Sequence, residues 1–172
     1  NDGLTLSTSN VANYSPRLAI FPDNSVLVAW SENSITVRAQ RISVDGVLMW
    51  SDGILIEDNN ASLMSPLPTI NAEGYALLQW ISQSGPFWAA NSELYLQKFD
   101  LDGNPLWSEA TVSAGPVVFP MGNWLQQSVA ENLGGGYSAW TEMSGNVQSA
   151  VTQHINVDGE LSWIDGVELS DN

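Results

Sequence analysis

The chain contains no cysteine among its 172 residues, so it forms no disulfide and offers no thiolate as a nucleophile or metal ligand. It also has only four Lys and Arg residues against 19 Asp and Glu, which gives a formal net charge of −15 at pH 7. A surface of that sign repels phosphate and argues against nucleic acid or an anionic membrane as partner. No apolar run approaches the roughly 20 residues that span a bilayer, so we predict no membrane insertion.

Signatures of catalysis are missing as well. The sequence has no GxSxG, no HExxH, no phosphate-binding glycine loop and no Ser/His/Asp grouping. The single histidine, His154, supplies too few ligands for a zinc site. Paired carboxylates that meet in a funnel between repeats would permit glycoside hydrolysis, but no spacing points to such a pair. The sequence therefore predicts a chain that is not an enzyme and has no cofactor.

Calcium is the one metal that the sequence suggests, and the signal is weak. The run Asp100-Leu101-Asp102-Gly103-Asn104 faintly resembles a calcium loop, but it lacks the later acidic ligand of a hand motif. The corresponding runs in the other repeats do not keep the oxygen ligands. Asp-Gly is also the strongest short signal for a β-hairpin, so we interpret this run as a turn.

Three copies of one phrase dominate the sequence. Residues 40–50, 97–107 and 153–163 each begin with Gln, contain Asp-Gly at their centre and end on Trp. Successive Asp-Gly pairs lie 57 and 56 residues apart. Self-similarity at one period indicates a single supersecondary unit that is copied and placed side by side.

Each copy is predicted to form four short strands. Turn residues separate the apolar segments, and no segment of eleven or more residues keeps a helical period, so the class is all-β. In an Asp-Gly hairpin we expect both central residues to have positive φ. The predicted strands are 17–21, 25–30, 35–43 and 47–56 in the first copy, 67–71, 75–80, 93–101 and 105–112 in the second, and 127–131, 136–141, 149–157 and 160–169 in the third.

Strand alternation assigns roles to the repeated side chains. The repeated Gln shares a face with apolar residues, so we expect it to point inward and to bond to neighbouring backbone. The next residue should then point to solvent and pair with charges across the strands. Two series of Trp are expected to pack between sheets. These positions are Gln40, Gln97 and Gln153, then Arg41, Lys98 and His154, and then Trp30, Trp80, Trp140, Trp50, Trp107 and Trp163.

The boundaries of the copies follow from matching the ends of the chain. Residues 2–7 match residues 165–170, so the chain holds three whole copies and one surplus strand. We predict one repeat domain, 1–172, in which 1–13 is the surplus strand of a preceding repeat and the repeats are 14–60, 61–116 and 117–172. We interpret it as a segment of a larger array, or as a piece that closes only with another copy.

Binding residues are expected where the copies differ. Trp88 and Trp124 are the two Trp outside the repeat pattern, and both lie in Gly/Pro-containing loops, where binding residues collect. With Phe87 and Met121 they form the predicted ligand- or partner-binding site. An exposed aromatic there could stack on a sugar ring or insert into a protein. The alternative is a loop anchored over a sheet edge by its aromatic residue.

Residues 39–53 and 96–107 resemble a repeat of large bacterial proteins exported to the cell surface, many by the type IX secretion system. Its pattern is Gln, a basic and a hydrophobic residue, then Asp-Gly or Asn-Gly, then Trp and Gly. The resemblance implies β-propeller-like blades of four antiparallel strands, in three repeats of about 50–57 residues. A β-trefoil is the alternative, because three copies of four strands would close it.

The resemblance also implies an extracellular or cell-surface location. The expected function is a non-catalytic repeat scaffold within a larger adhesin or envelope assembly. Its partners would be other protein chains or the remaining repeats of the same polypeptide. The alternative is a carbohydrate-binding, lectin-like module that uses the loop tryptophans on glycans.

Overall fold

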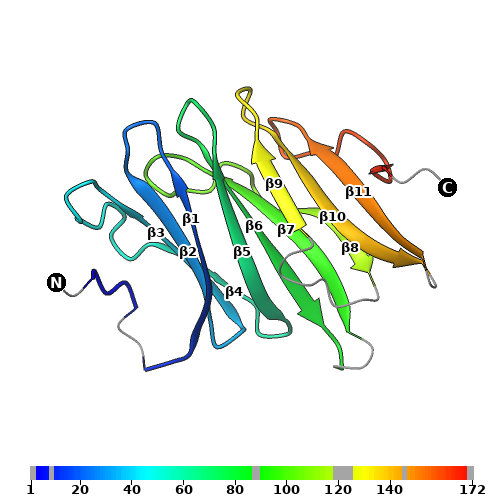
Figure 1. The fold of residues 1–172 in the computed structure, drawn as a ribbon, viewed down its shortest axis with the longest axis horizontal. Coiled ribbons are helices and arrows are strands. Elements are labelled where there is room, and N and C mark those ends of the chain that lie inside the picture. Colours follow the sequence, from blue (N-terminus) through cyan, green and yellow to red (C-terminus); the bar gives the residue numbers. More distant parts are fainter. Residues whose placement is uncertain (1–2, 8–9, 87–89, 118–125, 145–146, 170–172) are drawn as a thin grey trace.

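The computed structural model describes residues 3–7, 10–86, 90–117, 126–144 and 147–169. All regular secondary structure in these residues is β-strand, so the predicted all-β class is confirmed. The strands form three separate four-stranded antiparallel sheets (Figure 1). None of the described segments is a helix long and apolar enough to cross a membrane.

Each sheet is made by one repeat, and strands that follow one another in sequence are neighbours in the sheet. The first sheet contains β1 (Asn13–Ile20), β2 (Val26–Glu32), β3 (Thr36–Ile42) and β4 (Ile54–Glu57). The second contains β5 (Ser62–Ile70), β6 (Ala76–Ser84), β7 (Asn91–Phe99) and β8 (Thr111–Val117). The third contains β9 (Gln126–Ala130), β10 (Gly136–Ser144), β11 (Val147–Ile155) and β12 (Val167–Glu168).

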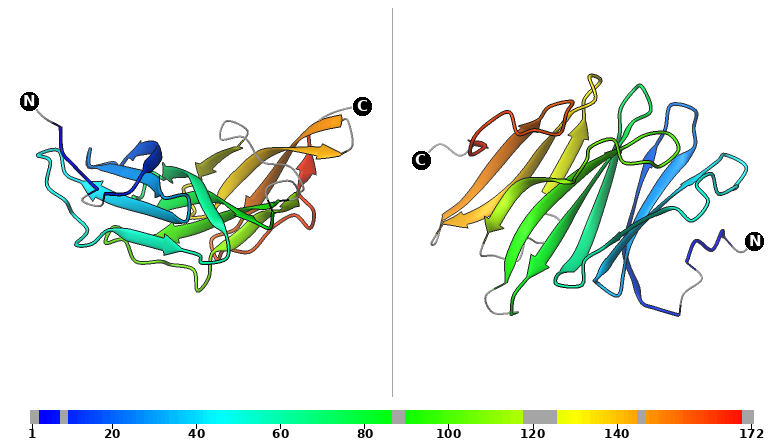
Figure 2. Two further views of the ribbon diagram at one scale, coloured as in Figure 1. Left: turned by 90° about the horizontal axis from the view of Figure 1, so that it is seen from below. Right: turned by 180° about the vertical axis from the view of Figure 1, so that it is seen from behind.

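The three sheets follow one another from one end of the molecule to the other (Figure 1), and Figure 2 shows this succession from two further directions. The first strands of neighbouring sheets contact each other, β1 with β5 and β5 with β9. At the other edge of the second sheet, β8 contacts β10 and β11 of the third sheet. The second sheet is therefore covered on both faces.

The first strands of two sheets begin earlier than predicted because each contains a β-bulge. β1 and β5 carry Ser-Pro, and the pairing register shifts there. The serines adopt positive φ, 52° at Ser15 and 54° at Ser65. Proline has no N–H to give to the ladder and is tolerated at a bulge, so the strand continues beyond Pro16 and Pro66 instead of starting after them.

The predicted fourth strands are wrong in their first halves. In the first sheet a single bridge joins Leu48 to Ile42, and regular pairing resumes only at Ile54. Between these points the side chain of Gln40 takes the place of strand pairing. Its Nε2 donates to the Trp50 carbonyl at 2.6 Å, and its Oε1 accepts from the Trp50 N–H at 3.1 Å.

The same arrangement recurs in the other two sheets, where Gln97 bonds to the backbone of Trp107 and Gln153 to the backbone of Trp163. In each sheet the Gln Oε1 also accepts from the N–H of the residue that follows it. All three Gln side chains are buried. The prediction of an inward Gln bonded to neighbouring backbone is therefore confirmed.

The Asp-Gly turns differ from the predicted geometry. Only the glycine has positive φ, 81° at Gly46, and the preceding Asp45 does not. The Gly46 N–H donates to the Ser43 carbonyl, and the Ser43 N–H donates to the Val47 carbonyl. This is a type I turn followed by a glycine bulge, which relieves Asp of the left-handed conformation. Gly103 and Gly159 repeat it, with φ of 85° and 87°.

The two contacts between sheets differ in polarity. Leu27, Ala29 and Val37 of the first sheet pack with Leu78 and Trp80 of the second in one apolar cluster. Between the second and third sheets, buried polar side chains accompany the apolar clusters. Their hydrogen bonds join Gln79 to Gln126 and Ser138, and Gln126 to the carbonyl of Ser65.

Packing between sheets is confirmed for four of the six repeated tryptophans. Trp50, Trp80, Trp107 and Trp140 belong to the buried clusters. Trp30 is buried too, but on the outer face of the first sheet, where no other sheet of the described residues packs against it. Trp163 is only half-buried.

We expect Gln97→Ala to lower the free energy of unfolding by about 2–4 kcal/mol, because each buried backbone group left without a partner costs roughly 1–3 kcal/mol. Urea denaturation followed by circular dichroism measures this. The matched control is Gln127→Ala, at an exposed position of β9. Equal losses in the two variants would contradict a structural role for the repeated Gln.

Candidate interaction surface

The residues predicted to bind a ligand or partner lie outside the part of the chain that the structure describes. Phe87 and Trp88 fall in segment 87–89, and Met121 and Trp124 fall in segment 118–125. Their role stays a prediction. The described residues reveal a different surface, which is best understood from the way that one sheet contacts the next.

A tryptophan of each sheet packs against the Asp-Gly turn of the following sheet. The Trp50 Nε1–H donates to the Leu101 carbonyl, in the turn of the second sheet, at 2.8 Å. A Cβ built on Gly103 would lie 2.9 Å from the Trp50 ring. Glycine therefore serves two purposes here, because it permits positive φ and lets the turn lie directly on the indole. We call this arrangement the Trp–turn contact.

The second and third sheets repeat the Trp–turn contact in the same direction. The Trp107 Nε1–H donates to the Val157 carbonyl at 2.9 Å, and a Cβ on Gly159 would lie 2.7 Å from the Trp107 ring. The Thr111 hydroxyl also donates to the Gly159 carbonyl. The contact is therefore a repeated property of the stack.

The prediction that the residue after the Gln points to solvent is wrong for Arg41 and Lys98, which are each 6% exposed. Both face the following sheet. The Arg41 Nη1–H donates to the Leu101 carbonyl at 2.8 Å, the same oxygen that accepts from Trp50. Alternation distinguishes two faces of a strand, but in a stack the second face is covered as well.

The charges of these cations are balanced within the contact. Arg41 pairs with Asp23 at 2.7 Å and lies 4.2 Å from the centroid of the Phe21 ring. The Lys98 ammonium lies 4.5 Å from the centroid of the Tyr75 ring. Burial lowers the pKa of Lys98, while the carboxylates of Asp158 and Glu73 oppose that shift.

The third sheet presents the same positions on its outer face. Tyr137, three residues before Trp140, matches Leu27 and Leu77, which are 0% and 1% exposed. Tyr137 is 42% exposed. Its ring centroid lies 4.7 Å from that of His154 and 6.1 Å from that of Trp163. We call Tyr137, His154 and Trp163 the aromatic face.

His154 occupies the cation position of the third sheet and is a partly buried member of the aromatic face. Its Nε2 lies 3.2 Å from the Glu131 Oε1. Glu131 lies in the turn after β9 and not on a strand paired with β11, so the charge pairing across strands that the sequence suggested stays a prediction. The ring of His154 also lies 5.9 Å from that of Trp163, so both side chains of the repeated phrase line one surface.

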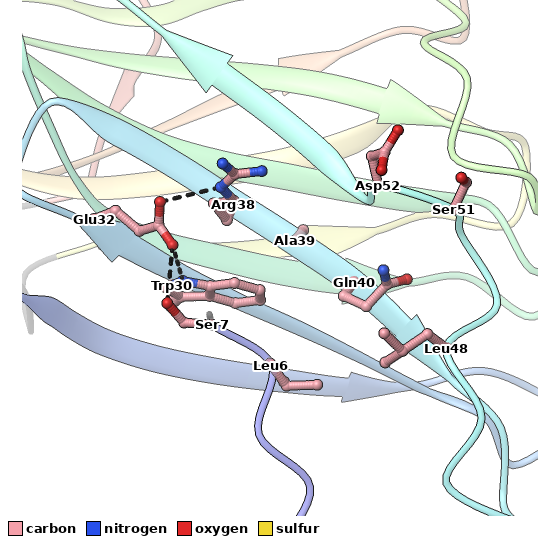
Figure 3. A pocket seen from close by; sticks show the side chains of 10 residues that line it. All are labelled: Leu6, Ser7, Trp30, Glu32, Arg38, Ala39, Gln40, Leu48, Ser51 and Asp52. Atoms are coloured by element: carbon pink, nitrogen blue, oxygen red, sulfur yellow. Dashed lines mark hydrogen bonds and ion pairs between the residues drawn. The ribbon is translucent and has the colours of Figure 1, made fainter. Parts of the chain in front are cut away.

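A polar groove lies on the outer face of the first sheet, at the opposite end of the stack (Figure 3). Glu32 accepts from Arg38 at 3.1 Å and from the Trp30 Nε1–H at 3.3 Å. Burial alone would raise the pKa of Glu32, but the hydrogen bonds from Arg38, Trp30 and Ser7 hold it below its ordinary value. Sequence reasoning missed Glu32, although Glu142 follows Trp140 as Glu32 follows Trp30 and accepts from the Trp140 indole N–H at 3.2 Å.

The carboxylates of this groove do not form a convergent pair. Figure 3 shows Glu32 beside Arg38 and Trp30 at one end and Asp52 at the other. The Glu32 carboxylate is occupied by its ion pair and hydrogen bonds. This geometry fits a structural ion pair that anchors the sheet.

The run that faintly resembles a calcium loop is a turn in the structure. The Asp100 carboxylate accepts from the N–H groups of Asp102 and Asn104 at 2.9 and 2.8 Å, which is how an Asx turn closes. Burial opposes ionisation of Asp100, but these bonds and the Asn104 side chain lower its pKa. Within the described residues, no three His, Asp or Glu side chains group as metal ligands.

Comparison with known structures gives a distant similarity. A solved structure similar to this chain is that of a thermostable family-43 glycoside hydrolase, with 12% sequence identity and a TM-score of 0.49. The match covers 93% of this chain and 55% of that chain, so the chain spans about half of its length. No protein-family model matches the chain, and no curated protein is similar to it.

This finding corrects one prediction. The sequence indicated a chain that is not an enzyme, whereas the similar structure belongs to an enzyme, so we withdraw that prediction. At 12% identity and this TM-score, the similarity assigns neither an activity nor a substrate to the chain.

We expect Gly103→Ala to destabilise the protein by about 1–3 kcal/mol more than Gly46→Ala, because only Gly103 lies against an indole ring and crowding a packed site costs roughly that amount. Gly46 and Gly103 both have positive φ, 81° and 85° respectively, so the backbone strain of the two alanine variants is matched. A Cβ on Gly46 meets no heavy atom of the described residues within 4 Å. Thermal and urea unfolding of both variants measure the difference, and equal losses would contradict the Trp–turn contact.

We expect Glu32→Gln to lower the free energy of unfolding by about 1–2 kcal/mol at neutral pH, because it removes hydrogen bonds to a charged group. The folded-state pKa of Glu32 is depressed, so its stabilisation is present above the unfolded pKa and is lost as pH falls through the lower folded value. The wild type and the variant should therefore converge in acid. Urea unfolding across this pH range measures the difference, with the exposed Glu57→Gln as control. A difference that does not depend on pH would refute the assignment.

Proposed function

We propose that the chain is a stretch of β-propeller-like repeats that serves as an extracellular or cell-surface scaffold within a larger adhesin or envelope assembly. It would bind other protein chains, or further repeats of the same polypeptide, through the aromatic face of the third sheet. One observation carries this proposal. Tyr137 is exposed and His154 and Trp163 are only partly buried, although their counterparts on the first two sheets are covered by protein.

The propeller-like arrangement is supported by the order of the strands. Each sheet is a four-stranded meander, and the first strands β1, β5 and β9 are neighbours from one sheet to the next. Every described strand pairs only within its own repeat. A β-trefoil would require strands of different repeats to pair in one barrel, so the pairing favours blades.

A protein partner is favoured over a small ligand by the chemistry of the aromatic face. Tyr and Trp are enriched where proteins contact each other, and they carry much of the binding energy there. The equivalent residues Trp50 and Trp107 make their contacts with backbone and glycine of a neighbouring sheet. The aromatic face therefore offers the groups that recognise a turn of a β-sheet.

Location and export are proposed from the resemblance to secreted bacterial repeats. The carbohydrate-binding alternative depends on Trp88 and Trp124, which lie outside the described residues, and no observation in the described part favours it. It stays a prediction.

We expect a photo-crosslinking amino acid at position 163 to capture protein in cells that produce the chain. The same group at Leu106, an exposed position of the second sheet, should capture none. Protease added to intact cells should digest the adducts, because the proposed location is extracellular. Immunoblotting after irradiation measures both results. An absence of adducts at position 163, or their protection in intact cells, would overturn the proposed function.

A further inference from the structure

We infer that the protein partner of the aromatic face is a second copy of this chain, which docks the Asp-Gly turn of its first sheet against Trp163. This inference rests on the proposed function and names the partner for the same surface. The two contacts inside the chain supply the template, because each joins the Trp of one sheet to the turn of the next in one direction.

The donor side of the template is present on the third sheet. Trp50 and Trp107 each donate their Nε1–H to the carbonyl of the residue before Asp-Gly in the following sheet, at 2.8 and 2.9 Å. Trp163 ends the same phrase and is held by the same side chain, because Gln153 bonds to its backbone carbonyl at 2.6 Å. Its backbone is therefore held as in the other two sheets, and its indole lies beside Tyr137 and His154 and is only half-buried.

The acceptor side of the template is present on the first sheet. Its turn has the same hydrogen bonds and positive φ as the other two Asp-Gly turns. Gly103 and Gly159 are each covered by an indole, whereas a Cβ built on Gly46 meets no heavy atom of the described residues within 4 Å. Val44, the residue before Asp-Gly, is 71% exposed. Space for an indole ring is thus available at this turn.

The cation position strengthens the match. Arg41 donates to the same Leu101 carbonyl as Trp50, so that oxygen receives two donors from the preceding sheet. In the docked pair, His154 would stand beside Trp163 as Arg41 stands beside Trp50. The Val44 carbonyl of the second copy would accept these hydrogen bonds, as the Leu101 carbonyl does within the chain.

Residues 3–7 lie on the face of the first sheet where docking would place a strand of the second copy. Leu6 and Ser7 line a groove with Trp30 and Gln40, as β4 does with Trp80 and Gln97 of the second sheet. These residues belong to no described strand, and Leu4 is half-exposed. In the docked pair, β12 of one copy would replace residues 3–7 of the other on this face.

The predicted interface is heterologous, because one end of the stack meets the other end of its neighbour. Such contacts close into a ring when the rotation allows it and otherwise form an open chain.

Two variants each disrupt one half of the interface. Trp163→Ala removes the indole, and Gly46→Asn fills the space at the turn with a residue that tolerates the left-handed conformation. Both positions lie at open ends of the stack, so each variant should remain folded.

Sedimentation velocity of the purified chain over a wide concentration range tests the inference. The wild type should assemble as concentration rises, and each variant should weaken assembly by about tenfold or more in Kd. A mixture of the two variants should form a complex of two copies and no larger species, because each variant keeps one intact half. Leu106→Ala is the control and should assemble like the wild type, and circular dichroism checks the fold of every variant.

A wild type that stays monomeric at all concentrations would overturn the inference. So would a mixture of the two variants that stays monomeric while the wild type assembles, or assembly that neither variant weakens. These failures are distinct from failure of the proposed function. Capture of a different protein at position 163 in cells, with a monomeric purified chain, would leave the scaffold proposal standing and remove the second copy as partner.

Discussion

The Trp–turn contact is the interaction on which the rest of the structure depends. It combines a buried indole, a hydrogen bond from the indole N–H to a turn carbonyl, and a glycine that lets the turn lie on the ring. Truncating a buried Trp to Ala costs about 3–5 kcal/mol, so each contact is a large share of the stability of a small sheet. Because the contact joins only neighbouring sheets, stability is passed from sheet to sheet along the stack.

The direction in which the sheets stack follows from the strand that carries the repeated phrase. Its Gln faces the preceding sheet and replaces strand pairing around the Trp, while the next side chain faces the following sheet. The two ends of the stack are therefore different surfaces. One end presents an indole and the other presents an open glycine turn, so association through them continues the stack in the same direction.

Specificity between sheets comes from residues that the repeat does not share. Ala29 of the first sheet corresponds to Gln79 of the second, which bonds to Gln126 and Ser138 of the third. A buried amide without these partners would be costly, so the second and third sheets match each other and not an apolar face. On the aromatic face, Tyr137 takes the place of Leu27 and Leu77, so this face differs from both of the contacts between sheets.

The sequence by itself determined the all-β class, the three repeats, the four strands in each and the role of the repeated Gln. These follow from local signals, namely alternation, turn residues and the need of a buried amide for partners. Only the tertiary structure decided that Arg41 and Lys98 are buried, that the fourth strands are interrupted, that Glu32 forms an ion pair, and that Trp163 is left half-exposed. Alternation gives a strand two faces, but which of them is covered depends on the neighbouring sheet, and a repeat carries the same residues whether or not that neighbour is present.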